Sequence, residues 1–302
     1  RDRSPSRGLG DVYKRQPLTE IGVNVKEGDF ILAVDGNSTK NVSDFYQLLV
    51  GTAGKQVRLK VNSKASETGS RDVTVIPIAD EQKLYYYSWV QKNIAKVTAA
   101  TNGRVGYLHI PNMGSEGLNE FVKYYYAQLN KEALIVDDRG NGGGNVSPHI
   151  IERLRREPVQ VTVSRNGKPS FEPAEQIIGP KIALIDEYSA SDGDIFAYRF
   201  RKHKLGTIIG KRSWGGVVGI RGSLPIVDGG FLNRPEFSRY NVEGTQWEIE
   251  GHGVDPDIVV ENDPYKAFIG EDQQLDKAIE LIKEQMKGKS YLEPAPPAYP
   301  KK

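Results

Sequence analysis

The amino-acid sequence predicts an α/β fold: a mixed, largely parallel sheet with flanking helices, preceded by a smaller β-rich region. Two observations lead to this prediction. Short, wholly apolar runs such as Ala133–Val136 and Ile182–Ile185 are typical of buried parallel strands. From about residue 105 onward, these runs alternate with segments whose apolar residues follow helical spacing, which is the pattern of successive strand–helix–strand units.

The first sixteen residues, Arg1–Gln16, fit neither region. They are basic, rich in turn-forming residues and without hydrophobic periodicity. They resemble translated sequencing-adapter sequence, so we interpret residues 1–16 as a non-native segment outside the fold. On this interpretation the native chain begins upstream of Pro17, and its start is missing.

The β-rich region is predicted at residues 17–80, where the sequence resembles alternating strands and turns. The stretch Val25–Gly36 predicts a turn, an apolar strand and an Asp-Gly turn. Asn41 or Ser43 is expected to cap a short helix that ends near Val50. Two further strands are expected at Val57–Val61 and Val73–Ile78.

Residues 81–290 predict the α/β domain, which a long helix over Asp80–Thr101 introduces. Further strands are expected at Val105–Ile110, Ala133–Val136, Val159–Val163, Ile182–Ile185, Thr207–Ile209 and Gly215–Ile220. Further helices are expected at Leu118–Leu129, Ser147–Arg156, after Ser191, and at Asp272–Met286. The Pro-rich tail, residues 291–302, is expected to be extended and to contact the body of the domain.

The composition argues against several classes of function. A net charge of +2 gives no electrostatic argument for a nucleic-acid or membrane partner, and no apolar run approaches the roughly 18 residues of a membrane span. The absence of cysteine excludes disulfides and thiolate chemistry. The histidines are not clustered, so we expect no metal and no other cofactor. These are His109, His149, His203 and His252.

Ser191 stands at the corner between a predicted buried strand and a helix. A hydroxyl at a helix N-terminus faces free backbone N–H groups and the positive end of the dipole, which suits an acyl-transfer nucleophile. Ser191 and Asp194 also match a helix-capping box. Taken alone, this stretch favours the cap.

The triple glycine Gly142–Gly144 follows another buried strand, where it allows backbone N–H groups to point into a cavity. The spacing of a phosphate-binding loop is absent. Combined with a hydroxyl at a second strand-to-helix corner, the loop becomes a candidate oxyanion hole. Its donors would be the amides of Gly144 and Asp192.

Four motifs resemble the tricorn protease family, serine proteases related to the tail-specific, C-terminal-processing proteases. They are DDRGNGGGNVS from Asp137, EYSASDGDIFAYRF from Glu187, GKRSWGGVVGI from Gly210 and EGHGVDPDI from Glu250. The resemblance runs from about Ile21 to Pro264 in the family's order. EGDFILAVDG, within Val25–Gly36, also resembles a PDZ domain, of which roughly the last two-thirds is covered. The resemblance therefore implies a truncated PDZ domain followed by a tail-specific, crotonase-like protease core.

This resemblance implies a serine peptidase that hydrolyses oligopeptides through an acyl-enzyme on Ser191. It implies the amides of Gly144 and Asp192 as oxyanion donors, and Glu250 as the acid that steers a catalytic histidine through an intervening serine. It implies the cytoplasm as compartment, with the periplasm as the alternative because the native N-terminus is missing. A homo-oligomer of the full-length protein is compatible with it.

Two departures from the family matter. The family's catalytic histidine precedes the PDZ domain, and no histidine of this chain matches it, so we expect a fragment that is inactive alone.

A Ser–Lys tail-specific protease is the first alternative, but Gly216 occupies the place of its lysine, and Lys211 is interpreted as a surface charge. His252, two residues after Glu250, is interpreted as a loop residue. The second alternative is a non-catalytic, PDZ-bearing peptide-binding protein.

Overall fold

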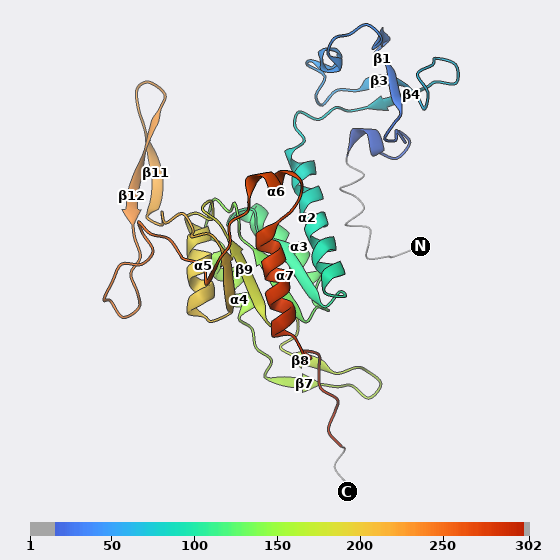
Figure 1. Ribbon diagram of the computed structural model, residues 1–302. Coiled ribbons are helices and arrows are strands. Elements are labelled where there is room, and N and C mark those ends of the chain that lie inside the picture. Colours follow the sequence, from blue (N-terminus) through green and yellow to red (C-terminus); the bar gives the residue numbers. More distant parts are fainter. Residues whose placement is uncertain (1–15, 299–302) are drawn as a thin grey trace. The chain divides into compact units, whose positions relative to one another are not determined.

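The protein's structure, a computed structural model, describes residues 16–298 (Figure 1). Residues 1–15, nearly all of the segment interpreted as non-native, lie outside the described residues, as do residues 299–302 of the tail. The chain divides into two compact units, residues 1–91 and 92–302.

The first unit contains a four-stranded antiparallel sheet in the order β2-β1-β3-β4. Its elements are η1 (Pro17–Thr19), β1 (Phe30–Val34), β2 (Asn37–Ser38), η2 (Phe45–Leu49), β3 (Val57–Asn62) and β4 (Arg71–Val75). Every second residue of β3 is buried in the core of this unit, which is the alternation of a sheet with one covered face. The predicted cap is wrong: Asp44 caps η2 by accepting from the Tyr46 amide at 2.9 Å.

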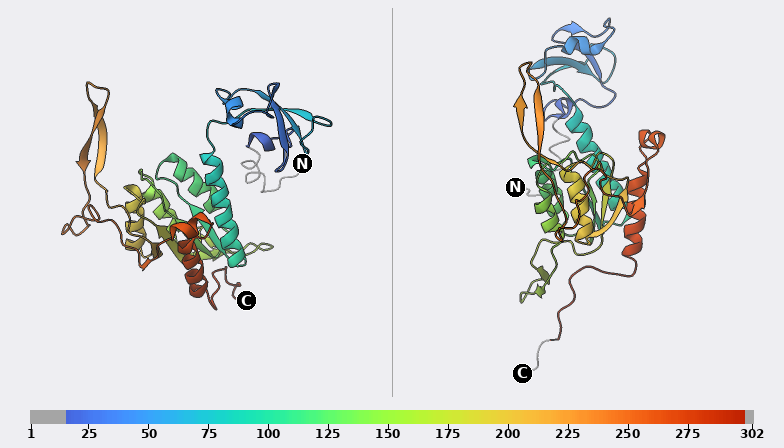
Figure 2. Two further views of the ribbon diagram at one scale, coloured as in Figure 1. Left: turned by 45° about the horizontal axis from the view of Figure 1, so that its top comes forward. Right: turned by 90° about the vertical axis from the view of Figure 1, so that its left-hand side faces the viewer.

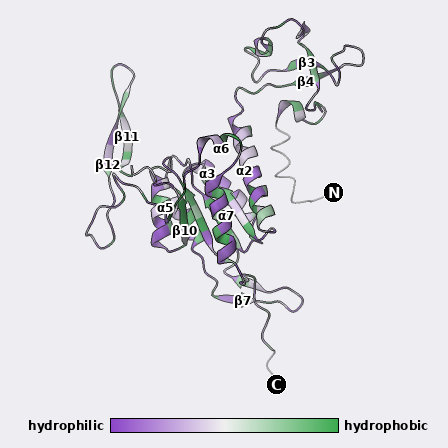
Figure 3. Ribbon diagram, viewed as in Figure 1, coloured by the Kyte–Doolittle hydropathy of each residue, from purple (hydrophilic) through white to green (hydrophobic). Residues whose placement is uncertain are grey.

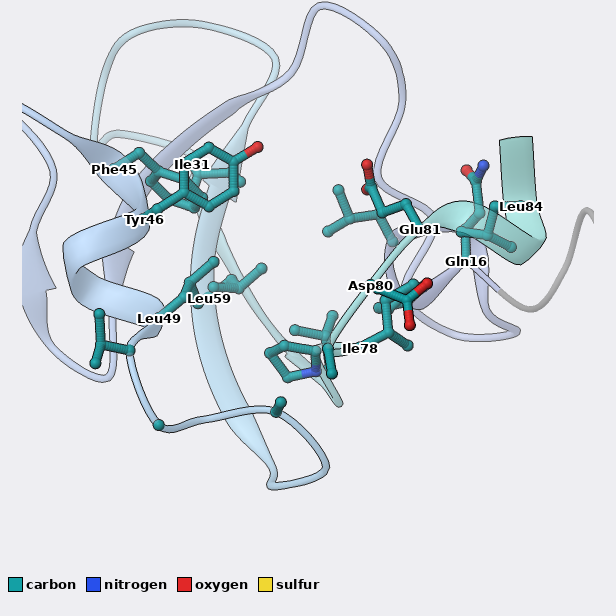
Figure 4. A pocket seen from close by; sticks show the side chains of 18 residues that line it. Gln16, Ile31, Phe45, Tyr46, Leu49, Leu59, Ile78, Asp80, Glu81 and Leu84 are labelled. Carbon is teal, nitrogen blue, oxygen red and sulfur yellow. The ribbon is translucent and has the colours of Figure 1, made fainter. Parts of the chain in front are cut away.

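A pocket of about 560 Å³ opens in the first unit, beside η2 (Figure 4). Apolar side chains of η2, β1 and β3, among them Phe45, Leu49 and Ile31, form one wall. Asp80 and Glu81 stand on the other side. Every residue that lines the pocket therefore belongs to the first unit.

The second unit is built on a five-stranded sheet in the order β13-β10-β9-β6-β5, with all strands parallel. Its strands are β5 (Val105–His109), β6 (Ala133–Asp137), β9 (Lys181–Ile185), β10 (Gly206–Gly210) and β13 (Ile258–Val259). All residues of β5, β6 and β9 are buried, because helices cover both faces of a parallel sheet of this kind. The predicted α/β fold class is confirmed.

Helices form a layer on each side of this sheet (Figures 1 and 2). They are α2 (Gln82–Ala100), α3 (Ser115–Tyr126), α4 (Ser147–Leu154), α5 (Asp192–Lys202), α6 (Pro264–Phe268) and α7 (Gln273–Gln285). α7 and the C-terminal half of α2 pack on one face, and α3, α4 and α5 cover the other. Figure 3 shows the strands between the two layers as largely hydrophobic. None of the helices in residues 16–298 is both long and apolar enough to cross a membrane.

In the first unit, the strand expected at Val73–Ile78 is β4, Arg71–Val75. Three predicted elements of the second unit differ more clearly from the structure. α3 begins at Ser115 rather than Leu118, because Asn112 Oδ1 accepts from the amides of Gly114 and Gly117 and organises the turn that starts the helix. The strand predicted at Val159–Val163 does not join the parallel sheet. It forms β7 (Gln160–Thr162) and pairs with β8 (Ser170–Glu172) in a separate antiparallel ribbon.

The third difference is the strand predicted at Gly215–Ile220. Residues 211–218 are irregular, and only then does β11 (Gly219–Pro225) begin, paired with β12 (Phe231–Phe237) in a hairpin that extends away from the sheet (Figure 1). The reason is that the Glu250 carboxylate accepts from the amides of Val217 and Val218, so these amides cannot join a ladder.

The start of the tail contacts the second unit, as expected. Tyr291 packs against the core between the sheet and α7, and its amide donates to Glu132 Oε2 at 3.1 Å. Arg104 donates to the Lys289 carbonyl at 3.0 Å. These contacts join the end of the chain to the N-terminal edge of the sheet.

Arg139 joins the end of β6 to the start of α7. Its guanidinium donates to Asp137 at 2.9 Å and to Asp272 at 2.8 Å, and Asp272 in turn caps α7. The side chains of Arg139 and Asp137 are 9% and 0% exposed, so this is a buried ion pair.

We predict that Arg139→Met lowers the free energy of unfolding by about 3–5 kcal/mol, because it leaves the Asp137 carboxylate buried without its partner. Lys277→Met, which breaks the exposed Lys277–Glu280 pair, is the matched control and should cost at most about 0.5 kcal/mol. Denaturant titration of both variants measures the difference. Equal losses would contradict the role assigned to Arg139.

Candidate active site

The predicted site residues follow the carboxyl ends of neighbouring strands. The glycine loop comes after β6 and Ser191 comes after β9, and these two strands are adjacent in the sheet. The loops that leave the carboxyl edge of a parallel sheet commonly form its binding site. The sheet therefore brings together two motifs that lie about 47 residues apart in the sequence.

Ser191 occupies the N-cap position of α5 in an unusual backbone conformation, with φ 55° and ψ −113°. A positive φ in a residue with a side chain is strained and persists only where the surroundings impose it. The Ser191 side chain makes no capping hydrogen bond. Capping therefore does not explain the strain, whereas a nucleophile presented on a sharp strand-to-helix turn commonly has such a backbone.

The glycine loop lies directly against this turn. A Cβ added at Gly143 would stand 2.6 Å from the Ser191 Cβ and 3.1 Å from the Asp192 nitrogen. The Ala190 amide donates to the Asn141 carbonyl at 2.7 Å, which holds the two loops in this contact. At Gly144 an added Cβ would stand 2.1 Å from the Met113 carbonyl oxygen. Only glycine fits at both positions.

The amides of Gly144 and Asp192 are free. Within residues 16–298 neither donates a hydrogen bond to another residue, and the Asp192 amide belongs to the first turn of α5, where no intrahelical acceptor is available. The Asp192 amide directly follows the strained serine, and Gly144 directly follows Gly143, which lies against Ser191. These two N–H groups are therefore candidates for binding an oxygen atom that acquires negative charge.

The Asp192 carboxylate has a separate, structural role. It accepts from the Ser147 amide at 2.9 Å and from the Ser147 hydroxyl at 2.6 Å. Ser147 is the first residue of α4, and Arg199 donates to its hydroxyl at 2.6 Å. The buried carboxylate thus anchors the start of α4 to the start of α5.

Glu250 binds backbone amides. Its Oε2 accepts from Val217 at 2.7 Å and from Val218 at 2.8 Å. Leaving aside the side chain of Arg221, Glu250 forms no ion pair with any residue between 16 and 298. The contacts that connect it to the Ser191 turn run through residues 213–218.

The alternative bases are engaged elsewhere. Lys211 lies at the end of β10 and pairs with Glu187 and Glu261 at 2.7 and 3.1 Å, as expected of a surface charge. His252 lies in an exposed turn, as predicted, with its Nε2 2.7 Å from Asp255.

Two buried polar residues beneath the glycine loop were not among the predicted site residues. Asn141 and Asp138 are both 0% exposed, and Asn141 Nδ2 donates to Asp138 Oδ1 at 2.9 Å. Burial, together with Asp137 and other nearby carboxylates, raises the pKa of Asp138 well above its ordinary value. The sequence feature that could have identified them is their position directly after a wholly apolar strand, where polar residues are buried only if they have partners.

Comparison with known proteins gives two family matches. The model of peptidase family S41 matches residues 104–260, and the model of the tricorn protease PDZ domain matches residues 10–80. The second match covers the region in which a PDZ domain was expected.

Individual relatives agree with these matches. The tricorn protease of Thermoplasma volcanium is 41% identical over 269 residues, which cover 89% of this chain and 26% of that protein. Tricorn protease homolog 1 of Streptomyces coelicolor is 39% identical, covering 93% of this chain and 26% of the relative. A crystal structure of the tricorn protease superposes with a TM-score of 0.80 at 38% identity, over 90% of this chain and 26% of that one. The chain thus spans about a quarter of the length of these relatives.

We predict that alanine destabilises the protein at Gly143 but not at the neighbouring Gly142. Gly143→Ala should lower the free energy of unfolding by about 1–3 kcal/mol, because its methyl group would overlap Ser191. Gly142→Ala should stay within about 0.5 kcal/mol, because an added Cβ there has no atom within 4 Å. Denaturant unfolding checks both. A neutral Gly143→Ala would show that the glycine loop does not press on the Ser191 turn.

A second prediction concerns Asp138. Since burial raises its pKa, the folded state binds this proton more tightly than the unfolded state. The resulting stabilisation is complete below the ordinary carboxyl pKa of about 4 and is lost as the pH rises towards the pKa in the folded state. Asp138→Asn resembles the neutral acid, so it should flatten this decline and be more stable than wild type at pH 8. Denaturant unfolding curves between pH 4 and pH 9 give the free energy of unfolding of both proteins. If this free energy falls equally with pH in wild type and Asp138→Asn, the prediction is wrong.

Proposed function

The chain belongs to peptidase family S41, and from this premise we propose that it is the catalytic portion of a tricorn-type serine peptidase that hydrolyses oligopeptides through Ser191. The observation that carries the proposal is the contact between the glycine loop and Ser191. Gly143 lies against the Ser191 turn, and within residues 16–298 the amides of Asp192, directly after Ser191, and of Gly144, directly after Gly143, donate no hydrogen bond.

In the proposed reaction the Ser191 hydroxyl attacks the scissile carbonyl and passes its proton to a general base. The carbonyl oxygen becomes an oxyanion, to which the amides of Gly144 and Asp192 donate. The intermediate collapses to an acyl-enzyme as the base protonates the departing amine. A water molecule, activated by the same base, then releases the acyl group.

Glu250 is proposed to act on the base rather than on the substrate. Its carboxylate has one oxygen bound to the amides of Val217 and Val218. The other oxygen is available to a residue of the base system, and, leaving aside the side chain of Arg221, the lack of an ion pair to Glu250 within residues 16–298 supports this assignment. The carboxylate would orient the base and stabilise its protonated form.

The base itself is proposed to be a histidine supplied by a region of the native protein that precedes Pro17. His252 is bound to Asp255 in an exposed turn, and Lys211 is bound in two ion pairs. The chain covers 26% of the Thermoplasma volcanium relative, which leaves ample sequence for such a histidine. We therefore propose that the 302-residue chain alone is close to inert, since a serine hydroxyl is a poor nucleophile without a base.

Two alternatives are less well supported. A Ser–Lys mechanism lacks a lysine at Gly216, and the ion pairs of Lys211 with Glu187 and Glu261 hold it away from catalysis. A purely peptide-binding protein would have no use for the strained Ser191 backbone, which costs about 1–3 kcal/mol wherever it occurs.

The test is peptide hydrolysis by two forms of the protein. One is the 302-residue chain. In the other, the extended form, residues 1–16 are replaced by the region of the Thermoplasma volcanium tricorn protease that precedes the part aligned with Pro17. We expect near-background turnover by the first form and Ser191-dependent turnover by the second. Ser191→Ala in each form is the control, and circular dichroism checks that each form is folded.

The outcomes separate the parts of the proposal. Turnover that survives Ser191→Ala would remove Ser191 as nucleophile. Ser191-dependent turnover by the 302-residue chain alone would show that its base lies within it, and His252→Ala would then be made first. A folded, extended protein with no activity on any oligopeptide would contradict the peptidase proposal. In an active form, loss of one oxyanion donor should lower kcat by about 100- to 1000-fold.

A further inference from the structure

Residues 213–218, which we call the crossing segment, connect the Ser191 turn to the Glu250 loop. At the Ser191 side, the Trp214 amide donates to the Ser189 carbonyl at 3.1 Å, and the Gly215 amide donates to Asp194 Oδ1 at 2.8 Å. At the other side, the Gly251 amide donates to the Gly215 carbonyl at 2.7 Å. The crossing segment therefore links the Ser191 turn to the Glu250 loop through hydrogen bonds outside helices and strands.

Ser213 lies at the centre of this link. Its hydroxyl donates to Asp194 Oδ1 and accepts from the Val254 amide at 2.8 Å. Its own amide donates to the Val254 carbonyl at 3.0 Å. Packing is tight there as well, because a Cβ added at Gly253 would stand 2.4 Å from the Ser213 carbonyl oxygen. One serine thus binds the first turn of α5 and the end of the Glu250 loop.

The link joins two strained turns. Ser191 and Ile249 both have φ 55°, and Ile249 immediately precedes Glu250. A positive φ is especially unfavourable for a β-branched residue such as isoleucine. Asp194 follows Ser191 by three residues, and Val254 follows Ile249 by five. Strain of this kind persists only when neighbouring contacts impose it, and the Asp194–Ser213–Val254 contacts are placed to do so for both turns.

Both side chains of the link are inaccessible to a substrate. Asp194 is 0% exposed and Ser213 is 3% exposed. Neither can touch a peptide or take part directly in proton transfer, so any influence on the reaction has to pass through the residues that they hold.

We propose that Asp194 and Ser213 are positioning residues that hold the Glu250 loop in a fixed place relative to Ser191. The proposal rests on the proposed function of Ser191 and Glu250, and it adds how their relative position is maintained. Loss of the Ser213 hydroxyl removes one of the two donors to Asp194 Oδ1 and leaves the Val254 amide without its acceptor. The crossing segment then loosens, and the Val217 and Val218 amides lose their fixed geometry to Glu250.

The variants are Ser213→Ala, Asp194→Ala and Asp194→Asn. Asp194→Asn is the conservative variant, because an amide oxygen can still accept from Ser213 and Gly215. Thr101→Val is the matched control. The Thr101 hydroxyl is also buried, donates to the Val97 carbonyl at 2.7 Å and accepts from the Val105 amide at 3.3 Å, but it lies at the amino end of β5.

The first readout does not depend on activity. Amide hydrogen exchange of Val217 and Val218 is measured in the folded 302-residue chain. We expect Ser213→Ala and Asp194→Ala to speed their exchange about tenfold or more through local opening, and Thr101→Val to leave it unchanged. Equal exchange in Ser213→Ala and Thr101→Val would overturn the proposed link.

The second readout is kinetic, in the extended form of the enzyme. Ser213→Ala should lower kcat by about 100-fold, the typical effect of a displacement of about 1 Å at a catalytic group. KM should stay within about twofold, because the substrate makes no contact with Ser213. Asp194→Asn should retain more activity than Asp194→Ala, and Thr101→Val should match wild type. Unchanged kcat in Ser213→Ala, in an enzyme that Ser191→Ala inactivates, would overturn the positioning role and leave the peptidase proposal standing. If Ser191→Ala has no effect, the peptidase proposal fails while the exchange measurement still tests the link.

Discussion

The candidate site depends on one buried side chain, Asn141, which joins the ends of three strands. Its amide nitrogen donates to the Ile110 carbonyl after β5 and to Asp138 after β6, and its amide oxygen accepts from the Gly143 amide. Its backbone carbonyl accepts from the Ala190 amide after β9. Nearly every hydrogen-bonding group of this residue is therefore used, and the distance between the glycine loop and the Ser191 turn follows from its position.

Around this centre the structure accommodates several buried carboxylates in different ways. Asp137 is paired with Arg139, and Asp192 accepts from the first residue of α4. Asp194 accepts from a hydroxyl and an amide, although burial raises its pKa. Asp138 is as buried as Asp137 and Asp194, and its burial raises its pKa well above the ordinary value. An ionised carboxylate in such a place needs a cation or several donors, and within residues 16–298 the one buried cation that pairs with any of these four is Arg139.

In the second unit, the rigid strands and the residues with a strained backbone are separate parts of the structure. The strands β5, β6 and β9 are wholly buried and carry none of the proposed catalytic groups, whereas the strained residues Ser191 and Ile249 lie in the loops beyond the sheet. A rigid sheet can impose a costly backbone on a short loop when enough contacts connect the two. The contacts of Asn141 do this at the Ser191 turn, and those of Ser213 extend it to the Glu250 loop.

The sequence by itself determined the α/β class, four of the five strands of the parallel sheet (β5, β6, β9 and β10) and the family, because apolar runs and contiguous motifs are local properties. The tertiary structure decided what depends on distant partners. Residues 215–218 are not part of a strand because Glu250, more than thirty residues later, accepts from the amides of Val217 and Val218. Ser191 matches a cap in sequence, yet its backbone and the glycine loop after another strand leave its hydroxyl without a capping role. The raised pKa of Asp138 likewise follows from burial, since a carboxylate's pKa depends on the atoms around it rather than on its neighbours in the chain.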